Sequence, residues 1–590
     1  MINTNKRTLK ASPLLLISTV SILALSLAYL IYSMVSSERF GLLTPDAIIS
    51  YLPLANKLIE APLTLWSEPI AITVAPGGYI YMALAGAQPD RIFILNIILA
   101  ALSVLLIFDL CRRLGGLSAG LAGALLYCFS PLLIEVLIPA LNEPPYLFFT
   151  ALWLWGTVLI RDKPEKKWPI IISGLALLFS ILTRAIYFYW LFPAIFTCFL
   201  IFLFSKKSDL KKLCLRIMAA HLIAAAGAGA YTLHNWKTHE TPMIATGSGT
   251  ALYFGSHLVT YGYEPPYLDM THDAWMVTDE VNSHLTPKND RRLSFAAKQM
   301  LLNMPAKDLI SLYVNKLGAI LFFSQANLEQ GVFNERAFRI VLLTLALVGF
   351  FYNRRNILIL MLFFVLLYVT AVHVPAMYNQ RYSIGALDLP LTLLAALGVA
   401  HLIHNRSDKK LFAAVLFASI GGIAIGSLHL RYSPPLMPRI DKGISYLALK
   451  APLENLEYQG FAGNPFIEPA IVLEKHTSII WKDISNHKRG GTPIISIDIE
   501  KMDQRCKRLD FTYTDKEHNT WQSSMPLKKP KAPLTLNVGS LSLDNIDKYN
   551  SQLEIQFRCP VDSKLKINKI ALYVVQTGLH YRKQLPIELK

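Results

Sequence analysis

Apolar residues along this chain gather in long runs that are separated by short polar stretches. Many of the runs are roughly 18 to 22 residues long, the length of helix that crosses a hydrocarbon core of about 30 Å. The runs at 145–160, 168–184 and 336–352 are shorter. The pattern predicts about eleven spans, at 12–34, 91–110, 115–134, 145–160, 168–184, 187–204, 213–233, 336–352, 356–373, 384–404 and 410–429.

Basic residues in the polar stretches predict the orientation of the spans. Lys and Arg favour cytoplasmic loops, and pairs such as Lys6-Arg7, Arg112-Arg113 and Arg354-Arg355 lie in alternate loops. We therefore expect these loops on the cytoplasmic side. The longer segments 35–90 and 234–335 then lie outside the cytoplasm.

Two apolar runs need separate interpretation. The run 309–323 would break the alternation of charged loops if it were a span, so we expect an interfacial helix there. The first run follows Lys6, Arg7 and Lys10 and has the outline of a signal peptide. It is too long and has no clear cleavage site, which predicts an uncleaved first span.

The last 160 residues have a different pattern. Apolar and polar positions alternate there with period two, with turn residues between the runs, which is typical of strands in a small β-sandwich. The chain is therefore expected to have two domains, a helical membrane domain at 1–430 and an extracytoplasmic β-sandwich-like domain at 431–590. The predicted strands lie at 493–499, 509–513, 534–538, 553–557 and 570–575.

Composition supports a membrane protein. The 590 residues are 53% hydrophobic and 16% charged, whereas a soluble chain is about a quarter charged. The net charge of +17 does not indicate nucleic-acid binding, because the basic residues lie in short loops where they set topology. The sequence has no glycine-rich phosphate loop and no His/Cys set with metal-ligand spacing.

Cysteine placement agrees with this division. Four cysteines lie in or beside the predicted spans, and only Cys506 and Cys559 lie in the tail. Each of these two is next to a predicted strand, and disulfides persist in oxidising compartments outside the cytoplasm. They are therefore a candidate disulfide pair, although the sequence does not fix their separation.

One carboxylate stands out in the first outer segment. Asp46 follows Thr44 and Pro45, directly after the first span, and apolar residues at helical spacing continue from Ile48. A carboxylate in the first turn of a helix interacts favourably with the helix dipole. One interpretation of Asp46 is therefore that it stabilises the start of a helix. The other is chemistry on a lipid-bound substrate at the membrane surface.

Two more charged residues lie at outer ends of predicted spans. Ionisable groups at such depth are costly and are often functional. Glu143 is either such a group or a loop carboxylate in water. Arg184 either snorkels beside an aromatic belt or binds a lipid phosphate.

The order of motifs resembles the GT-C superfamily of polytopic glycosyltransferases, in particular the branch with protein O-mannosyltransferases and lipid A aminoarabinose transferases. The resemblance covers about residues 12–430. It rests on six motifs in a fixed order. The first three are an outer-loop acid followed by a Tyr, a Pro-Gly-Tyr segment, and a Glu that starts a span. The last three are an Arg-Asn-like pair that opens the large outer loop, a Gly-rich segment and an Arg-Tyr pair. These motifs are Pro45-Asp46 with Tyr51, Pro76-Gly-Gly-Tyr79, Glu143, His234-Asn235-Trp236, Ala245–Gly255 and Gln380-Arg381-Tyr382.

Two positions depart from the pattern. Ala47 follows Asp46 where the family often has a Glu, and Ala75 stands where the aminoarabinose transferases carry a Lys. The resemblance therefore implies transfer of a sugar without naming the sugar or the acceptor. It also implies substrate-binding roles for Tyr51, Tyr79 and Asn235.

The implied reaction sets out the roles of the remaining residues. Outside the cytoplasm the sugar donor would be a polyprenyl phosphate, and the acceptor a protein, lipid A or another glycan. Asp46 is the candidate base for an inverting transfer, and Glu143 would assist it or bind sugar hydroxyls. Arg381, Tyr382 and Arg184 are candidates to hold the departing phosphate. Arg381 could instead be an interfacial anchor.

Other interpretations stay open at this point. A polysaccharide polymerase or ligase also has many spans and large outer loops. A lipid-linked sugar transporter would carry charges inside its spans, and we expect few here because Asp109 lies near a span end. Two outer carboxylates could hold a divalent ion, although no further ligands are evident. The resemblance implies a bacterial inner membrane, with the tail in the periplasm as a stabilising cap or as a binder of acceptor or carbohydrate.

Overall fold

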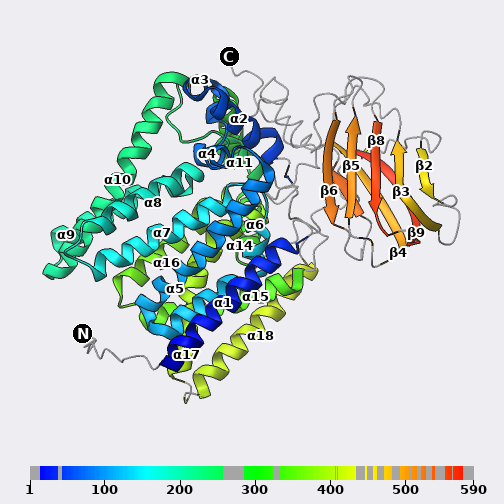
Figure 1. Cartoon of the computed structure of the whole chain (residues 1–590). Coiled ribbons are helices and arrows are strands. Elements are labelled where there is room, and N and C mark those ends of the chain that lie inside the picture. The colour runs from blue at the N-terminus through cyan, green and yellow to red at the C-terminus, as the bar shows by residue number, and fades with distance from the viewer. Residues whose placement is uncertain are drawn as a thin grey trace.

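A computed structural model of the whole chain provides the fold (Figure 1). Parts of the expected outer segments, including Pro45 and 257–284, lie outside the described residues. The structure describes residues 13–37, 43–44, 46–256, 285–322, 332–405, 407, 409–432, 446–447, 456–461, 471–481, 492–503, 506, 508–514, 520–526, 534–537, 552–560 and 562–575.

Helices make up the described chain as far as Tyr432 (Figure 1). The short ones near the start form the first outer segment, and the long ones pack into a bundle. Their bounds are α1 Pro13–Val35, η1 Ala47–Tyr51, α2 Leu52–Glu60, α3 Pro62–Leu65, η2 Pro69–Ile72, α4 Pro76–Leu84, α5 Pro89–Cys128, α6 Pro131–Leu137, α7 Glu143–Asp162, α8 Trp168–Thr183, η3 Ala185–Tyr187, α9 Leu191–Phe204, α10 Ser208–His239, α11 Ser248–Gly255, α13 Pro287–Asn303, α14 Ala306–Phe322, α15 Val332–Asn353, α16 Ile357–His373, α17 Gln380–His404 and α18 Lys409–Tyr432.

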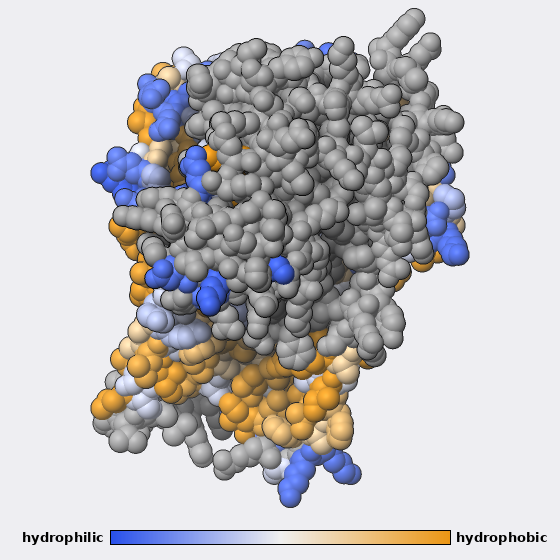
Figure 2. Space-filling model, turned by 90° about the vertical axis from the view of Figure 1, so that its right-hand side faces the viewer, coloured by the Kyte–Doolittle hydropathy of each residue, from blue (hydrophilic) through white to orange (hydrophobic). Residues whose placement is uncertain are grey.

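Five helical stretches in the described chain are long and apolar enough to cross a membrane: Ile17–Val35, Pro89–Cys128, Ala185–Phe204, Ser208–His239 and Ile384–His404. The helices α8 and α16 and most of α15 are apolar but shorter. On the face shown in Figure 2, apolar side chains gather over the lower part, with hydrophilic ones beyond them. The protein is thus a mostly helical membrane protein, while the count of eleven spans stays a prediction.

The two spans predicted at 91–110 and 115–134 belong largely to one kinked element, α5. Gly116 has a φ of 84°, so the chain turns there between two helical pieces. Only glycine adopts that conformation without steric cost. The second piece ends at Cys128, and α6 begins after Ser130, whose side chain accepts a hydrogen bond from the Leu133 backbone N–H.

The helix α17 lies at the centre of the bundle, with most of its residues buried. It packs against α5, α7, α15 and α16. Its apolar core positions include Leu387, Leu391 and Leu394, which are all nearly inaccessible to solvent. Because the first turn of α17 carries Arg381, the packing of this helix fixes the position of that side chain relative to α7.

A buried ion pair inside the bundle adds two charges that the sequence pattern did not single out. Arg339 of α15 donates to Asp388 of α17 at 2.6 Å, and both side chains are fully buried. Arg339 also donates to the Ile320 carbonyl of α14 at 3.1 Å. The two residues lie in separate predicted spans, so the sequence pattern gives no sign that they are partners. The pair links three helices next to the outer segment.

The described part of the tail consists of strands. Hydrogen bonds join them into a nine-stranded sheet whose main path is β6-β5-β8-β3-β9-β4-β7, with β1 on β9 and β2 on β3. All five expected strand runs coincide with strands, but a two-layered sandwich stays a prediction. The bounds are β1 Tyr446–Leu447, β2 Leu456–Phe461, β3 Ile471–Trp481, β4 Thr492–Met502, β5 Arg508–Thr514, β6 Thr520–Pro526, β7 Leu534–Asn537, β8 Gln552–Arg558 and β9 Lys564–Val575.

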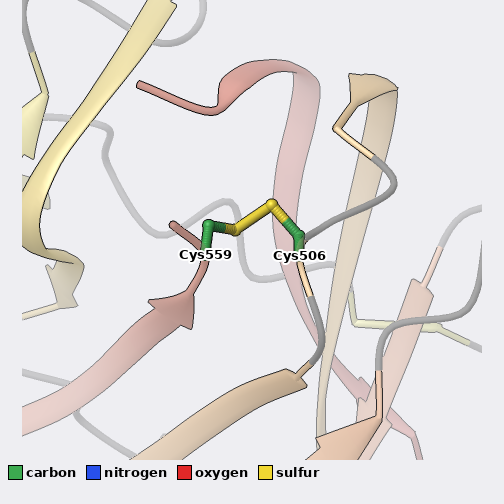
Figure 3. The surroundings of a disulfide bond; sticks show 2 residues. All are labelled: Cys506 and Cys559. Carbon is green, nitrogen blue, oxygen red and sulfur yellow. A yellow bond between two sulfur atoms is a disulfide. The ribbon is translucent and has the colours of Figure 1, made fainter. Parts of the chain in front are cut away.

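A disulfide joins Cys506 and Cys559 in the tail (Figure 3). Cys506 precedes β5 and Cys559 follows β8, and these strands pair antiparallel with Arg508 opposite Arg558. The register therefore brings the two cysteines together at one end of the strand pair.

Candidate functional site

Asp46 does not cap the helix that it precedes. Its side chain makes no hydrogen bond to the backbone of η1, whereas the Thr44 hydroxyl accepts a bond from the Ala47 N–H at 3.2 Å. Thr44 therefore has the capping role considered for Asp46, which leaves the Asp46 carboxylate free to face the bundle. The helix that follows is a π-helix, a rare geometry that is frequent at functional sites.

Glu143 is the first residue of α7, and its side chain is fully buried. A loop carboxylate in water does not fit this position. Its Oε1 atom lies 3.3 Å from Nη1 of Arg184. Its Oε2 atom has no hydrogen-bond partner among the described residues, so this buried carboxylate retains an acceptor that a substrate hydroxyl could use.

Arg381 connects the two carboxylates. Its Nη1 atom donates to Oδ2 of Asp46 at 2.7 Å, and its Nε atom lies 3.2 Å from Oε1 of Glu143. Together with Arg184 these residues form a cluster of two acids and two guanidinium groups, which we call the four-charge cluster. Asp46 and Arg381, the members most distant in sequence, are 335 residues apart. The four residues meet because η1, α7, α8 and α17 converge at one end of the bundle.

Exposure differs sharply within the four-charge cluster. The Asp46 side chain is 51% exposed and that of Arg381 is 25% exposed, whereas Arg184 is 10% exposed. The cluster therefore has an open side at Asp46 and a buried side at Glu143. A ligand would meet Asp46 and Arg381 first.

Two tyrosines border the cluster. The ring of Tyr382 lies 5.1 Å from the guanidinium carbon of Arg184 and 5.0 Å from that of Arg381, a cation–π arrangement. Tyr51 is buried in the same region, and burial, followed by the negative charges of Asp46 and Glu143, raises the pKa of its hydroxyl. Tyr51 therefore stays protonated and can donate a hydrogen bond.

The Pro-Gly-Gly segment allows α4 to approach this site closely. A Cβ atom on Gly78 would lie 2.6 Å from Cε1 of Tyr51, and one on Gly77 would lie 2.8 Å from the Cα atom of Thr183. Neither distance is tolerable, so both positions need glycine. The motif thus holds Tyr51 on one side and the residue before Arg184 on the other.

Tyr79 and Asn235, two of the predicted binding residues, have other partners. The Tyr79 hydroxyl donates to the Ala71 carbonyl at 3.3 Å, and its ring packs near Trp66. The Asn235 amide donates to the Met243 carbonyl at 2.7 Å. Among the described residues these bonds tie both side chains to the backbone of the outer segment, and a substrate-binding role for either residue stays a prediction.

Lys316 is a further buried cation that the sequence pattern did not reveal. It lies on α14, within the run expected to be an interfacial helix. Its ammonium group donates to the Gly255 carbonyl at 2.9 Å and to the Pro375 carbonyl at 3.0 Å. The Met377 N–H also donates to the Ala251 carbonyl at 2.7 Å. These bonds fix the backbone that leads into Arg381.

We expect Lys316 to make the stability of the protein depend on pH. Burial lowers the pKa of Lys316 to about 7, whereas an unfolded lysine has a pKa of about 10.4. Between these values the unfolded state binds more protons, so the stability rises with pH, by up to about 1.4 kcal/mol per unit. Thermal unfolding of the purified protein at pH 7, 8 and 9 measures this rise.

The variant Lys316→Met should remove the rise in stability between pH 7 and 9. Lys307→Met is a matched control, because Lys307 is exposed on the same helix and should keep the wild-type slope. An equal slope in wild type and Lys316→Met would show that another group is responsible.

Among the described residues, no group of three or more His, Cys, Asp or Glu side chains could hold a metal ion. In the four-charge cluster the two carboxylates already face guanidinium groups. Such an arrangement favours an anionic ligand, because a phosphate can replace a carboxylate at Arg381 and can be held bidentately.

Comparison with known proteins agrees with the resemblance expected from the motifs. Residues 79–231 match the family of dolichyl-phosphate-mannose-protein mannosyltransferases. This segment contains Glu143 and Arg184, and it ends before Arg381. The resemblance to GT-C membrane glycosyltransferases is thereby confirmed. No curated protein is significantly similar in sequence to the chain.

Solved structures that align with the chain at low TM-scores include an oligosaccharyltransferase and ArnT. The oligosaccharyltransferase AglB from Archaeoglobus fulgidus, in complex with an inhibitory peptide and a dolichol-phosphate, aligns with a TM-score of 0.38 and 14% identity over 70% of this chain. The alignment spans 56% of the AglB chain, so this protein covers little more than half of it. ArnT from Cupriavidus metallidurans in the apo state aligns with a TM-score of 0.31 and 14% identity, over 65% of this chain and 78% of the ArnT chain. At these scores the alignments transfer no residue roles.

Proposed function

We propose that the protein transfers a sugar from a polyprenyl phosphate to an acceptor on the extracytoplasmic face of a bacterial inner membrane. The observation that carries this proposal is the bridge by Arg381 between the exposed Asp46 and the buried Glu143. A phosphate-binding cation thus lies beside a carboxylate that can act as a base. The acceptor is a protein, lipid A or another glycan.

The reaction breaks the bond between the anomeric carbon and the phosphate oxygen. The donor phosphate carries one negative charge, and the released polyprenyl phosphate gains a second. Arg381 and Arg184 stabilise that charge as it develops, which is where electrostatic preorganisation has its largest effect. Tyr382, which lies against both guanidinium groups, holds them in place.

The acceptor hydroxyl attacks the opposite face of the anomeric carbon and loses its proton to Asp46. A single displacement with one carboxylate as base inverts the anomeric configuration and forms no covalent intermediate. Before this step the donor phosphate takes the place of Asp46 at Arg381, which frees the Asp46 carboxylate to accept the proton. The half-exposed position of Asp46 supports such an exchange.

Glu143 has a binding role in this scheme. Its Oε1 atom faces Arg184 and Arg381, and its buried Oε2 atom is without a partner among the described residues. A buried acceptor left unpaired is costly, and a sugar hydroxyl would satisfy it. Tyr51, which stays protonated, donates to the same sugar or to its phosphate.

The chain is divided in this proposal into a catalytic membrane domain at 1–430 and a periplasmic domain at 431–590. The disulfide in the tail supports an oxidising compartment for the second domain. That domain caps the site or recruits the acceptor.

Mass spectrometry of periplasmic glycoproteins and lipids in a deletion strain tests the function. We expect one glycoconjugate to lose a sugar in the deletion strain, to regain it with the wild-type gene, and not to regain it with Asp46→Asn at equal protein level. The mass lost names the sugar, and the molecule that loses it names the acceptor. Unchanged glycoproteins, glycolipids and polysaccharides in the deletion strain would contradict the proposal.

A further inference from the structure

A groove on the surface of the bundle has its polar end far from the four-charge cluster. It runs between α5 and α7, encloses about 330 Å³, and is lined mainly by Leu102, Leu105, Phe148 and Leu152. Leu102 and Leu105 are 41% and 47% exposed. Both helices belong to the part of the chain expected to cross the membrane, so this apolar groove faces lipid.

The groove becomes polar at one end only. Asp109 and Trp155 form that end, and the Trp155 indole N–H donates to the Asp109 carboxylate at 2.8 Å. Asp109 also accepts bonds from Arg112 at 3.1 Å and from Arg113 at 2.6 Å. Oδ2 of Asp109 thus accepts from both the Trp155 indole and Arg113, whereas Oδ1 accepts from Arg112, so the carboxylate gathers two guanidinium groups at the mouth of the groove.

The surroundings of this mouth are positively charged. Arg113 also pairs with Asp162 at 3.2 Å, and Arg161 pairs with the same carboxylate at 2.8 Å. Lys163 lies 5.1 Å from the ring of Trp168, which in turn lies 6.3 Å from Trp155. The four cations outnumber the two carboxylates, and the side chain of Arg112 is 46% exposed.

The groove is separate from the proposed catalytic site. The helix α7 begins at Glu143 and ends at Asp162, so the two ends are about 28 Å apart at 1.5 Å per residue. A lipid with its headgroup at Arg112 therefore cannot place that headgroup at Arg381. Its headgroup lies at the opposite surface of the membrane.

We propose that this groove binds an acyl chain of an anionic phospholipid. The chain lies along Leu102, Leu105 and Leu152, and the phosphate lies at Arg112 and Lys163, beside the indole rings of Trp155 and Trp168. Trp at headgroup level and basic residues facing an anionic leaflet both match this placement. A net positive mouth on an apolar groove distinguishes an anionic lipid from a zwitterionic one.

Lipid binding to the delipidated full-length protein tests the proposal. Native mass spectrometry compares phosphatidylglycerol with phosphatidylcholine of identical chains. We expect phosphatidylglycerol to bind about fivefold more tightly or better, since one basic residue near a headgroup contributes about 1 kcal/mol. Arg112→Gln should remove about fivefold of the affinity for phosphatidylglycerol and lower that for phosphatidylcholine less, because the choline ammonium offsets its phosphate charge.

A second variant tests the groove itself. Leu105→Trp fills it and should weaken both lipids, whereas Leu222→Trp places the same ring on an exposed position of α10 and should weaken neither. Equal affinities of the wild type for the two lipids would overturn the proposal, and this comparison needs no variant. Full phosphatidylglycerol binding by a folded Leu105→Trp would overturn the assignment to this groove.

Discussion

Replacing Asp46 by Asn is expected to lower the rate constant of sugar transfer by about 1,000-fold, within the range for loss of a general base. The amide keeps the size of the side chain but cannot take the acceptor proton. Because Asp46 is half-exposed and the Thr44 hydroxyl bonds to the Ala47 N–H, the fold should be unaffected. The measurement is single-turnover transfer in proteoliposomes with saturating donor.

A matched control for Asp46→Asn is Asp90→Asn. Asp90 is an exposed carboxylate in the first turn of α5, and its loss should change the rate by no more than about twofold. If Asp46→Asn kept the wild-type single-turnover rate, Asp46 would not be the base. Glu143 would then be the remaining carboxylate of the cluster to test.

The second large effect is expected for Arg381→Gln, which should lower the rate of transfer by about 100- to 1,000-fold, as for other losses of a charge-stabilising donor. The variant removes the cation that faces the departing phosphate. Donor binding should weaken as well, because the phosphate already carries a charge in the ground state. Rates at varied donor concentration separate the two effects.

Two further variants distinguish catalysis from folding at Arg381. Arg381→Lys keeps a charge but loses the planar fork, so its rate should lie between those of wild type and Arg381→Gln. The double variant Arg381→Gln, Glu143→Gln removes the buried charge that Arg381 offsets. If it restored transfer, the loss in Arg381→Gln would come from an unpaired Glu143 rather than from the missing phosphate ligand.

Sequence patterns predicted the helical membrane part and the strands of the tail because both depend on local periodicity. The runs of apolar residues predicted the helices, and the alternation of apolar and polar residues predicted strands such as β4 and β5. The same patterns predicted a break at Arg112-Arg113 between two spans, and the chain turns close by, at Gly116. They did not predict the left-handed conformation of Gly116, because the sequence does not show the backbone angles of a single glycine. Gly116 adopts a φ of 84°, a conformation that glycine reaches without steric cost.

The candidate site was predictable in part. Asp46, Glu143 and Arg184 could be selected because a charge at the end of an apolar run is unusual, and Arg381 because it belongs to an Arg-Tyr pair. The structure brings all four together. Their contacts could not be predicted, since Asp46 and Arg381 are brought together by packing alone. Tyr79 was selected on motif order, its hydroxyl donates to the Ala71 carbonyl, and its binding role stays a prediction.

Buried cations inside helices were the main omission. Arg339 and Lys316 lie in apolar runs, and a single charge does not change the hydrophobic pattern of such a run. Their partners are Asp388 for Arg339 and two backbone carbonyls for Lys316. Backbone acceptors leave no trace in the sequence, so only the structure reveals the role of Lys316.

In the proposed reaction Arg381 exchanges Asp46 for a lipid phosphate, and binding of polyprenyl phosphate tests this exchange without knowledge of the sugar. Purified wild-type protein should bind polyprenyl phosphate more tightly than polyprenol. Arg381→Gln should lose this preference, and Asp46→Asn should strengthen it because the competing carboxylate is gone. Equal binding of polyprenyl phosphate by wild type and Arg381→Gln would contradict the account.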